Sequence, residues 1–201
     1  MKLYFSPTSP YVRKVMVCAH ELGLADKIEK LSCAASPIIR DKNIIAQNPL
    51  GQVPTLIADD GQMLADSRVI CEYLDHVGGN KLFPRNSARW QAIVDQAMAD
   101  GILGAALLAR YETALRPGDK LWSDWLNGQM DKIKTTLTAL EAAAPKFGDR
   151  VDIGTISYAC ALSYLDLRFP TFEWRGAYPK AAAWYKAFET RPSMVATKLV
   201  G

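Results

Sequence analysis

The residues near the start of the chain that are best suited to chemistry are polar side chains at the first turns of predicted helices. Ser9 precedes Pro10, and Ser followed by Pro is typical of a helix start. The first N–H groups of a helix and its dipole favour negative charge, so a thiol held there would be stabilised as a thiolate. A hydrogen bond from the Ser9 hydroxyl would add to this effect. From its local sequence alone, Ser9 is better explained as a simple N-cap.

Two further features are also ambiguous when each is taken alone. Asp66-Ser67 begins a second predicted helix and offers a carboxylate for an amino group and a hydroxyl with N–H groups for a carboxylate. This combination suits the α-amino-acid end of a ligand, although an ordinary helix cap explains it too. Val53-Pro54 precedes a predicted strand. A cis proline there would expose backbone groups to an extended peptide, whereas a trans proline would simply begin the strand.

The elements that must position these residues alternate between strand and helix over residues 1–78. The pattern predicts a strand at 2–5, a helix at 10–22, a strand at 28–31, a hairpin at 53–64 and a helix at 67–77. The stretch 32–48 has no clear periodicity. The order is therefore βαβ–ββα, and the βαβ part implies two parallel strands.

The rest of the chain is predicted to be helical. Residues 79–86, with their Gly and Pro, suggest a linker, and residues 87–201 contain no convincing strand. The first long helix carries an apolar stripe of Trp90, Val94, Ala97, Gly101, Ala105 and Leu108. A second long helix follows, and Asp152 with Thr155 caps an apolar helix that we expect to be buried. We therefore expect an α/β domain at 1–78 and an all-α bundle at 87–201.

The composition excludes several classes of function. The net charge of +3 is too near balance, and the basic residues too dispersed, to indicate nucleic-acid binding. No uninterrupted apolar run suggests a membrane segment, and the N-terminus does not resemble a secretory signal, so we expect a cytoplasmic protein. The four cysteines form no CxxC pair, and the two histidines have no ligand spacing, so no metal is expected.

The order of three motifs resembles the glutathione S-transferase family. Ser9-Pro10-Tyr11-Val12-Arg13 is similar to its serine-type active-site motif, with the arginine one position early. Residues 48–56, NPLGQVPTL, resemble the family pattern N-P-x-x-x-V-P-x-L. Residues 66–74, DSRVICEYL, resemble [ED]-S-x-x-I-x-x-Y-L. The resemblance implies the fold of that family: a thioredoxin-like N-terminal domain followed by a helical bundle.

The resemblance also implies a role for each matched residue. Ser9 would donate to the sulfur of glutathione, with the neighbouring Thr8 as the alternative hydroxyl. Val53, beside a cis Pro54, would pair its backbone with the cysteinyl unit, and Asp66 with Ser67 would hold the γ-glutamyl end. The candidates for the glycyl carboxylate are Gln52, Ser36 and Arg40.

The activity implied is conjugation of the glutathione thiolate to a small hydrophobic electrophile, with glutathione as co-substrate and no metal. The alternatives are a glutathione-dependent isomerase, dehalogenase or peroxidase, and a regulatory module that binds glutathione without turnover. The family is typically dimeric, so a homodimer is expected. Asp100 lies where, in some classes of the family, a residue reaches the glutathione bound to the partner subunit. A charged side chain exposed to solvent on a helix explains Asp100 equally well.

Overall fold

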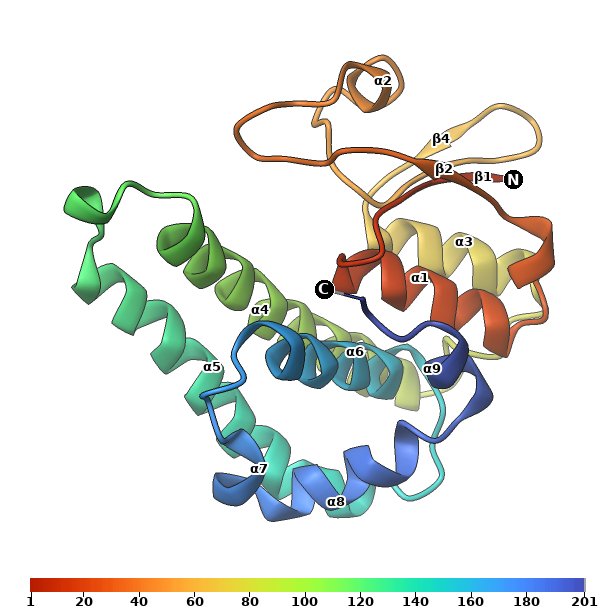
Figure 1. Ribbon diagram of the computed structural model, residues 1–201. Helices are drawn as coiled ribbons and strands as arrows, with labels where there is room; N and C mark the ends of the chain where they lie inside the picture. The colour runs from red at the N-terminus through yellow and green to blue at the C-terminus, as the bar shows by residue number, and fades with distance from the viewer. Residues whose placement is uncertain (201) are drawn as a thin grey trace. The chain divides into compact units, whose positions relative to one another are not determined.

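Four short strands form one mixed sheet in the order β2-β1-β3-β4 (Figure 1). They are β1 (Lys2–Phe5), β2 (Glu29–Ser32), β3 (Thr55–Ile57) and β4 (Met63–Leu64). β2 is parallel to β1, whereas β3 is antiparallel to β1 and β4 to β3. The predicted βαβ–ββα order is thereby confirmed. The computed structural model describes residues 1–200.

Two helices pack against one face of this sheet. α1 (Pro10–Glu21) and α3 (Ser67–Val77) lie side by side there, and the short α2 (Lys42–Ile45) lies on the other side (Figure 1). The core between sheet and helices consists of fully buried aliphatic side chains: Leu3, Val15, Leu56, Ile70 and Leu74. Each such side chain contributes roughly 1.5–3 kcal/mol through its burial. α2 lies in the stretch for which the sequence showed no pattern.

Helices make up the remainder of the chain. They are α4 (Ala88–Ala114), α5 (Ser123–Ala143), α6 (Ile153–Arg168), α7 (Trp174–Ala177), α8 (Pro179–Phe188) and α9 (Pro192–Ala196). Short 3-10 helices lie at η1 (Ala25–Lys27), η2 (Gly118–Lys120) and η3 (Ala144–Lys146). The chain divides into two compact units, residues 1–89 with 192 onward, and residues 90–191. The last segment thus groups with the sheet, whereas the sequence suggested one helical domain over 87–201.

α6 is the buried helix that the sequence predicted for the second unit. Every residue from Ile153 to Leu162 is buried. Its N-terminus has a reciprocal capping box: the Asp152 carboxylate accepts the N–H of Thr155 at 3.0 Å, and the Thr155 hydroxyl accepts the N–H of Asp152 at 3.0 Å. This pair, inverted relative to the usual order, caps the helix as expected.

The apolar stripe that the sequence shows on the first long helix lies mostly on the exposed side of α4. Trp90, Val94 and Leu108 on α4 are 71%, 48% and 44% exposed. The buried side consists instead of Ala92, Ala99, Ile102, Leu103, Ala106 and Ala109. The helix is apolar on most sides, so periodicity did not distinguish the two faces, and small alanines let neighbouring helices approach closely.

α4 is also the one helix in residues 1–200 that is long and apolar enough to cross a membrane by length and composition alone. Its most apolar window has a mean hydropathy of 1.4, and half of that window is buried inside the protein. The core helix of a soluble protein has the same properties, so this is weak evidence for a membrane span.

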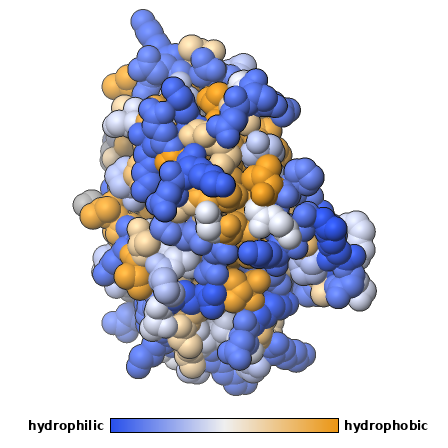
Figure 2. All heavy atoms as spheres, turned by 90° about the vertical axis from the view of Figure 1, so that its right-hand side faces the viewer, coloured by the Kyte–Doolittle hydropathy of each residue, from blue (hydrophilic) through white to orange (hydrophobic). Residues whose placement is uncertain are grey.

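On the face shown in Figure 2, polar side chains predominate and apolar ones occur in small separate groups.

Candidate functional site

The register of the sheet brings the three sequence motifs to one of its ends. Tyr4 on β1 pairs with Thr55 on β3, and Leu56 pairs with Leu64 on β4. Therefore β1 ends, β3 begins and β4 ends on the same side of the sheet. The segments that leave this side carry the predicted site residues: Ser9 after β1, Val53-Pro54 before β3, and Asp66-Ser67 after β4.

Ser9 is the N-cap of α1, and Pro10 is its first residue. The backbone of Ser9 is extended, with φ −83° and ψ 119°, and its Oγ accepts the N–H of Val12 at 3.3 Å. Because this bond uses only a lone pair, the Ser9 O–H proton is available to an acceptor that lies beyond the N-terminal end of the helix. The positive end of the helix dipole favours an anion at that position.

The neighbouring hydroxyl of Thr8 is turned toward the loop instead. Its Oγ1 lies 3.3 Å from the Oγ of Ser6, close enough for a hydrogen bond. The loop itself is a tight turn, since the N–H of Ser9 donates to the carbonyl of Ser6 at 3.2 Å. Thr8 therefore has a structural partner within the loop, whereas the Ser9 hydroxyl proton has none among residues 1–200.

The peptide bond between Val53 and Pro54 is cis. Neither the N–H nor the carbonyl of Val53 makes a backbone hydrogen bond within residues 1–200. The loop before it is held by Asn48, whose side-chain amide donates to the Thr55 hydroxyl at 2.8 Å, while that hydroxyl donates to the carbonyl of Gln52 at 2.8 Å. Both Asn48 and Thr55 are buried. The backbone of Val53 therefore has an unused donor, its N–H, and an unused acceptor, its carbonyl.

Asp66 caps α3 and Ser67 is its first residue. The Asp66 carboxylate accepts the N–H of Arg68 at 2.8 Å and lies 3.1 Å from its guanidinium. Partial burial raises the pKa of Asp66, but hydrogen bonds from Arg68 and the charges of Arg68 and Lys14 outweigh this, so the pKa lies below its usual value. Asp66 is therefore a carboxylate at neutral pH. Ser67 is buried at the helix start, and its N–H has no backbone partner among residues 1–200.

The predicted residues for a terminal carboxylate have different surroundings. The Ser36 hydroxyl accepts the N–H groups of Ile38 and Ile39 at 3.2 and 3.1 Å, so it stabilises a local turn. The side chain of Gln52 is exposed. The Arg40 guanidinium donates to the carbonyl of Pro49, close to the loop that contains Gln52. Gln52 therefore offers an amide in the loop before Val53, and Arg40 offers a cation beside Pro49 and Gly51 of the same loop.

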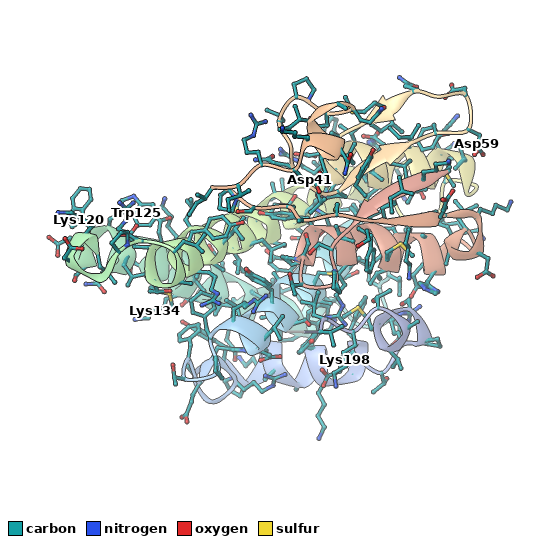
Figure 3. The ribbon with its side chains drawn as sticks, turned by 45° about the horizontal axis from the view of Figure 1, so that its top comes forward. Asp41, Asp59, Lys120, Trp125, Lys134 and Lys198 are labelled. Atoms are coloured by element: carbon teal, nitrogen blue, oxygen red, sulfur yellow. The ribbon has the colours of Figure 1, made fainter. Side chains whose placement is uncertain are left out.

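A further carboxylate fixes the segment between β2 and α2. Asp41, labelled in Figure 3 where the chain enters α2, accepts the N–H of Ala34 at 2.9 Å and that of Asn43 at 2.8 Å. These backbone hydrogen bonds lower the pKa of Asp41. The segment that carries Ser36 and Arg40 is thus closed into a loop by Asp41.

Comparison with known proteins identifies the fold and the family. The family model for the glutathione S-transferase N-terminal domain matches residues 8–77, and the one for the C-terminal domain matches residues 123–187. A relative from Escherichia coli, the uncharacterized GST-like protein YibF, is 36% identical over 176 residues, which cover 84% of this chain and 83% of the relative. The chain belongs to the glutathione S-transferase family.

Solved transferase structures match the chain over nearly its full length. A glutathione transferase family member from Pseudomonas fluorescens Pf-5, with bound glutathione, is 48% identical with a TM-score of 0.97, covering 100% of this chain and 99% of the other. A glutathione S-transferase from Methylobacillus flagellatus, with glutathione bound, is 33% identical with a TM-score of 0.88, covering 99% of each chain. The transferase fold inferred from the sequence is thereby confirmed.

Several residues of this chain that hold the candidate site were not singled out by the sequence. Asn48 and Thr55 were quoted only as parts of a motif, although their side chains organise the loop before Val53. Lys14 is fully buried on α1, and its ammonium lies 5.8 Å from the centre of the Tyr11 ring. Its position five residues after Ser9 is the one sequence signal that could have connected it with the site.

Three of the four cysteines of this chain are buried on helices. Cys18, Cys71 and Cys160 are fully buried, and each behaves as a small apolar side chain. Cys33 is partly exposed and its thiol donates to the carbonyl of Phe5 at 3.4 Å. Burial and the nearby Asp41 charge raise the pKa of Cys33, so this thiol is not activated.

Proposed function

We propose that this chain binds glutathione and conjugates its thiolate to a small hydrophobic electrophile. The observation that carries the proposal is that one end of the sheet presents three complementary groups. These are a hydroxyl at a helix N-terminus, a backbone with unused hydrogen-bonding groups, and an ionised carboxylate beside a second helix N-terminus. They come from Ser9, Val53 and Asp66.

Each group suits one part of the tripeptide. Asp66 would bind the α-amino group of the γ-glutamyl unit, and the Ser67 hydroxyl and N–H would bind its α-carboxylate. The N–H and carbonyl of Val53 would pair with the cysteinyl unit as an added strand does. Gln52, with Arg40 beside it, would bind the glycyl carboxylate. The Ser36 hydroxyl accepts two N–H groups and keeps its proton, so it would be a further donor for the same carboxylate.

In the proposed reaction, Ser9 donates its hydroxyl proton in a hydrogen bond to the sulfur and so favours the thiolate. A free thiol has a pKa near ~8.5, so a decrease of about two units makes it mostly thiolate at neutral pH. The thiol proton passes to solvent. The sulfur electron pair forms a bond to carbon, and the leaving group departs with its bonding electrons. When the acceptor is an activated alkene, the adjacent carbon takes up a proton instead.

The relatives support conjugation over the alternative activities. The structure of the Pseudomonas fluorescens Pf-5 family member has also been determined with bound S-(propanoic acid)-glutathione, at 48% identity to this chain. Such a molecule carries a carbon substituent on the glutathione sulfur, as a conjugation product does. In addition, Ser at position 9 rather than Cys is unsuited to thiol-transfer chemistry.

We also propose that the chain forms a homodimer, with an exposed apolar side of α4 as part of the interface. Trp90, Val94 and Met98 follow one another at four-residue steps and are 71%, 48% and 47% exposed. An exposed apolar stripe of this kind is typical of an interaction surface. Sedimentation analysis tests this proposal: a monomer at micromolar concentration would contradict it, and Trp90→Lys with Val94→Glu should convert a dimer to a monomer.

The central experiment is calorimetric titration with glutathione, followed by turnover of chlorodinitrobenzene. We expect wild type and Ser9→Ala both to bind glutathione, because Val53 and Asp66 remain. Turnover in Ser9→Ala should fall by roughly 10- to 100-fold, the effect of one hydrogen bond to a charged group. Thr8→Val is the matched control and should retain most activity.

Other outcomes would change the proposal in defined ways. The absence of a heat signal at millimolar glutathione would refute the binding function. Glutathione binding without turnover of any electrophile would favour the regulatory module. If Thr8→Val loses activity and Ser9→Ala does not, the sulfur contact belongs to Thr8.

A further inference from the structure

The segment that begins with α9 runs antiparallel along α1, toward the loop before Ser9. At the last turn of α1, the Ser193 hydroxyl donates to the Glu21 carboxylate. Near the first turn, the Arg13 guanidinium donates to the carbonyl of Met194 at 2.9 Å. Figure 1 shows this dark blue segment passing beside α1 and ending next to its first turn.

Arg13 holds the C-terminal end of α9. α9 has five residues, so its last carbonyls have no N–H partners within the helix. The guanidinium supplies donors to the carbonyl of Met194 and, at 3.5 Å, to the Thr197 hydroxyl, which itself donates to the carbonyl of Ser193 at 2.8 Å. Arg13 is 5% exposed. A buried cation needs such polar partners, so the segment and Arg13 stabilise each other.

Beyond α9 the segment reaches the loop that presents Ser9. The N–H of Val200 donates to the carbonyl of Pro7 at 3.4 Å. Leu199, the residue before it, is 9% exposed and anchors the segment by its side chain. Pro7 lies inside the turn closed by the Ser9 N–H and the Ser6 carbonyl. The C-terminal segment therefore contacts the turn Ser6–Ser9, although it lies far from the Ser9 motif in the sequence.

We propose that residues 192–200, held in place by Arg13, position the loop Ser6–Ser9 so that the Ser9 hydroxyl is directed at the sulfur of bound glutathione. The proposal rests on the function proposed above. Arg13 and Val200 are positioning residues. The Arg13 guanidinium and the Val200 N–H act on Ser9 through the loop, and neither touches a reacting atom. A displacement of the hydroxyl by about 1 Å is enough to weaken catalysis by up to about 100-fold.

The sharpest test compares Val200→Pro with Val200→Ala. Val200 is 64% exposed, so neither substitution removes buried packing, and only proline removes the N–H. We expect Val200→Pro to raise the pKa of the bound glutathione thiol and to lower kcat by roughly two- to tenfold relative to Val200→Ala. The KM for glutathione should be similar in the two variants, because Val53 and Asp66 are untouched.

Arg13 is tested by Arg13→Met and Arg13→Lys. Arg13→Met should raise the pKa of the bound glutathione thiol and lower kcat. Lysine keeps a donor and the positive charge, so Arg13→Lys should bring both values back toward those of the wild type. The pH profile of thiolate absorbance distinguishes positioning from general destabilisation, since a merely structural role leaves the profile of the folded fraction unchanged. If Arg13→Met does not fold, the Val200 pair still decides the question.

The outcomes separate this proposal from the proposed function. If wild type does not bind glutathione, both are refuted. If wild type binds and turns over, while Val200→Pro matches Val200→Ala in thiol pKa and kcat, the positioning role is refuted and the transferase function stands. A lower kcat with an altered thiol pKa in Val200→Pro alone supports both.

Discussion

The side-chain amide of Asn48 donates a 2.8 Å hydrogen bond to the hydroxyl of Thr55, across the loop that contains Val53. The same asparagine accepts the N–H of Leu50 at 3.0 Å, and Thr55 donates to the carbonyl of Gln52. Since Asn48 and Thr55 are 3% and 0% exposed, water cannot replace these bonds easily. The two residues therefore determine the shape of the loop that we propose binds the cysteinyl unit.

Removing this pair should weaken both folding and glutathione binding. Asn48→Ala leaves the Thr55 hydroxyl and the Leu50 N–H without their partner, which should lower the free energy of unfolding by roughly 1–3 kcal/mol. Urea unfolding and glutathione calorimetry measure the two effects. Asn127→Ala, at an exposed asparagine on α5, is the control and should change neither. Unchanged glutathione affinity in a folded Asn48→Ala would show that the loop does not bind the ligand.

The pKa of Asp66 should depend on Arg68. Burial raises this pKa, but Arg68 and Lys14 lower it below the ordinary 3.8. A lowered pKa means that the contribution of Asp66 to stability is complete above 3.8 and is lost as the pH falls through the lowered value. Arg68→Gln should raise the pKa, as NMR titration of the carboxyl carbon would show. Arg85→Gln, an exposed arginine in the same unit, should leave it unchanged.

The helix starts that the sequence predicted correctly, two of them at the candidate site, depend on local chemistry. Ser9, Asp66 and Asp152 are helix caps, and a cap is determined by a side chain and an N–H two or three residues later. Short-range patterns of this kind are visible in a sequence. The alternation of strand and helix patterns predicted the parallel pair of strands, and the order of the motifs indicated the family.

What the sequence did not predict depends on contacts between distant residues. Arg13 donates to the carbonyl of Met194, a residue 181 positions away, and no periodicity reveals such a pair. The buried side of α4 could not be read from the sequence for a related reason: Trp90 is apolar and exposed, whereas alanines such as Ala99 occupy the buried side. Only the packing partner decides which apolar side of a helix is buried.

A β-carbon at Gly154 should destabilise the second unit. It would lie 2.6 Å from the Cβ of Asp95 and 2.9 Å from the carbonyl oxygen of Ala92, so α4 and α6 would have to separate. Gly154→Ala should therefore lower the free energy of unfolding by about 1–3 kcal/mol. Gly128→Ala on α5 is the matched control, because its β-carbon meets nothing within 4 Å. That variant should gain about 0.5–1 kcal/mol, since alanine favours the helix, and equal urea midpoints for the two would contradict the prediction.

Tyr158 should titrate at unusually high pH. Burial and the charge of Asp95 raise the pKa of Tyr158 to about 12, against the opposing effect of Arg150. Because the folded pKa is raised, the stability contribution is complete below the ordinary value of 10.0 and is lost as the pH rises toward about 12. Tyrosinate absorbance during alkaline titration measures this. Tyr158→Phe should remove absorbance that develops near pH 12 in the wild type. If the variant instead loses absorbance that develops near the ordinary pKa of 10.0, the assignment is refuted.

Substitutions at Ser9 can separate helix capping from contact with the sulfur. Ser9→Ala loses the bond to the Val12 N–H and should cost about 1 kcal/mol of stability, together with the larger loss of turnover argued above. Ser9→Asp keeps a capping oxygen but offers no donor and places a negative charge beside the thiolate. It should therefore be as stable as wild type and the least active variant. Ser9→Thr keeps both functions and should retain stability and most activity. If turnover followed stability across the three variants, Ser9 would be only a helix cap, and the proposed contact with sulfur would be wrong.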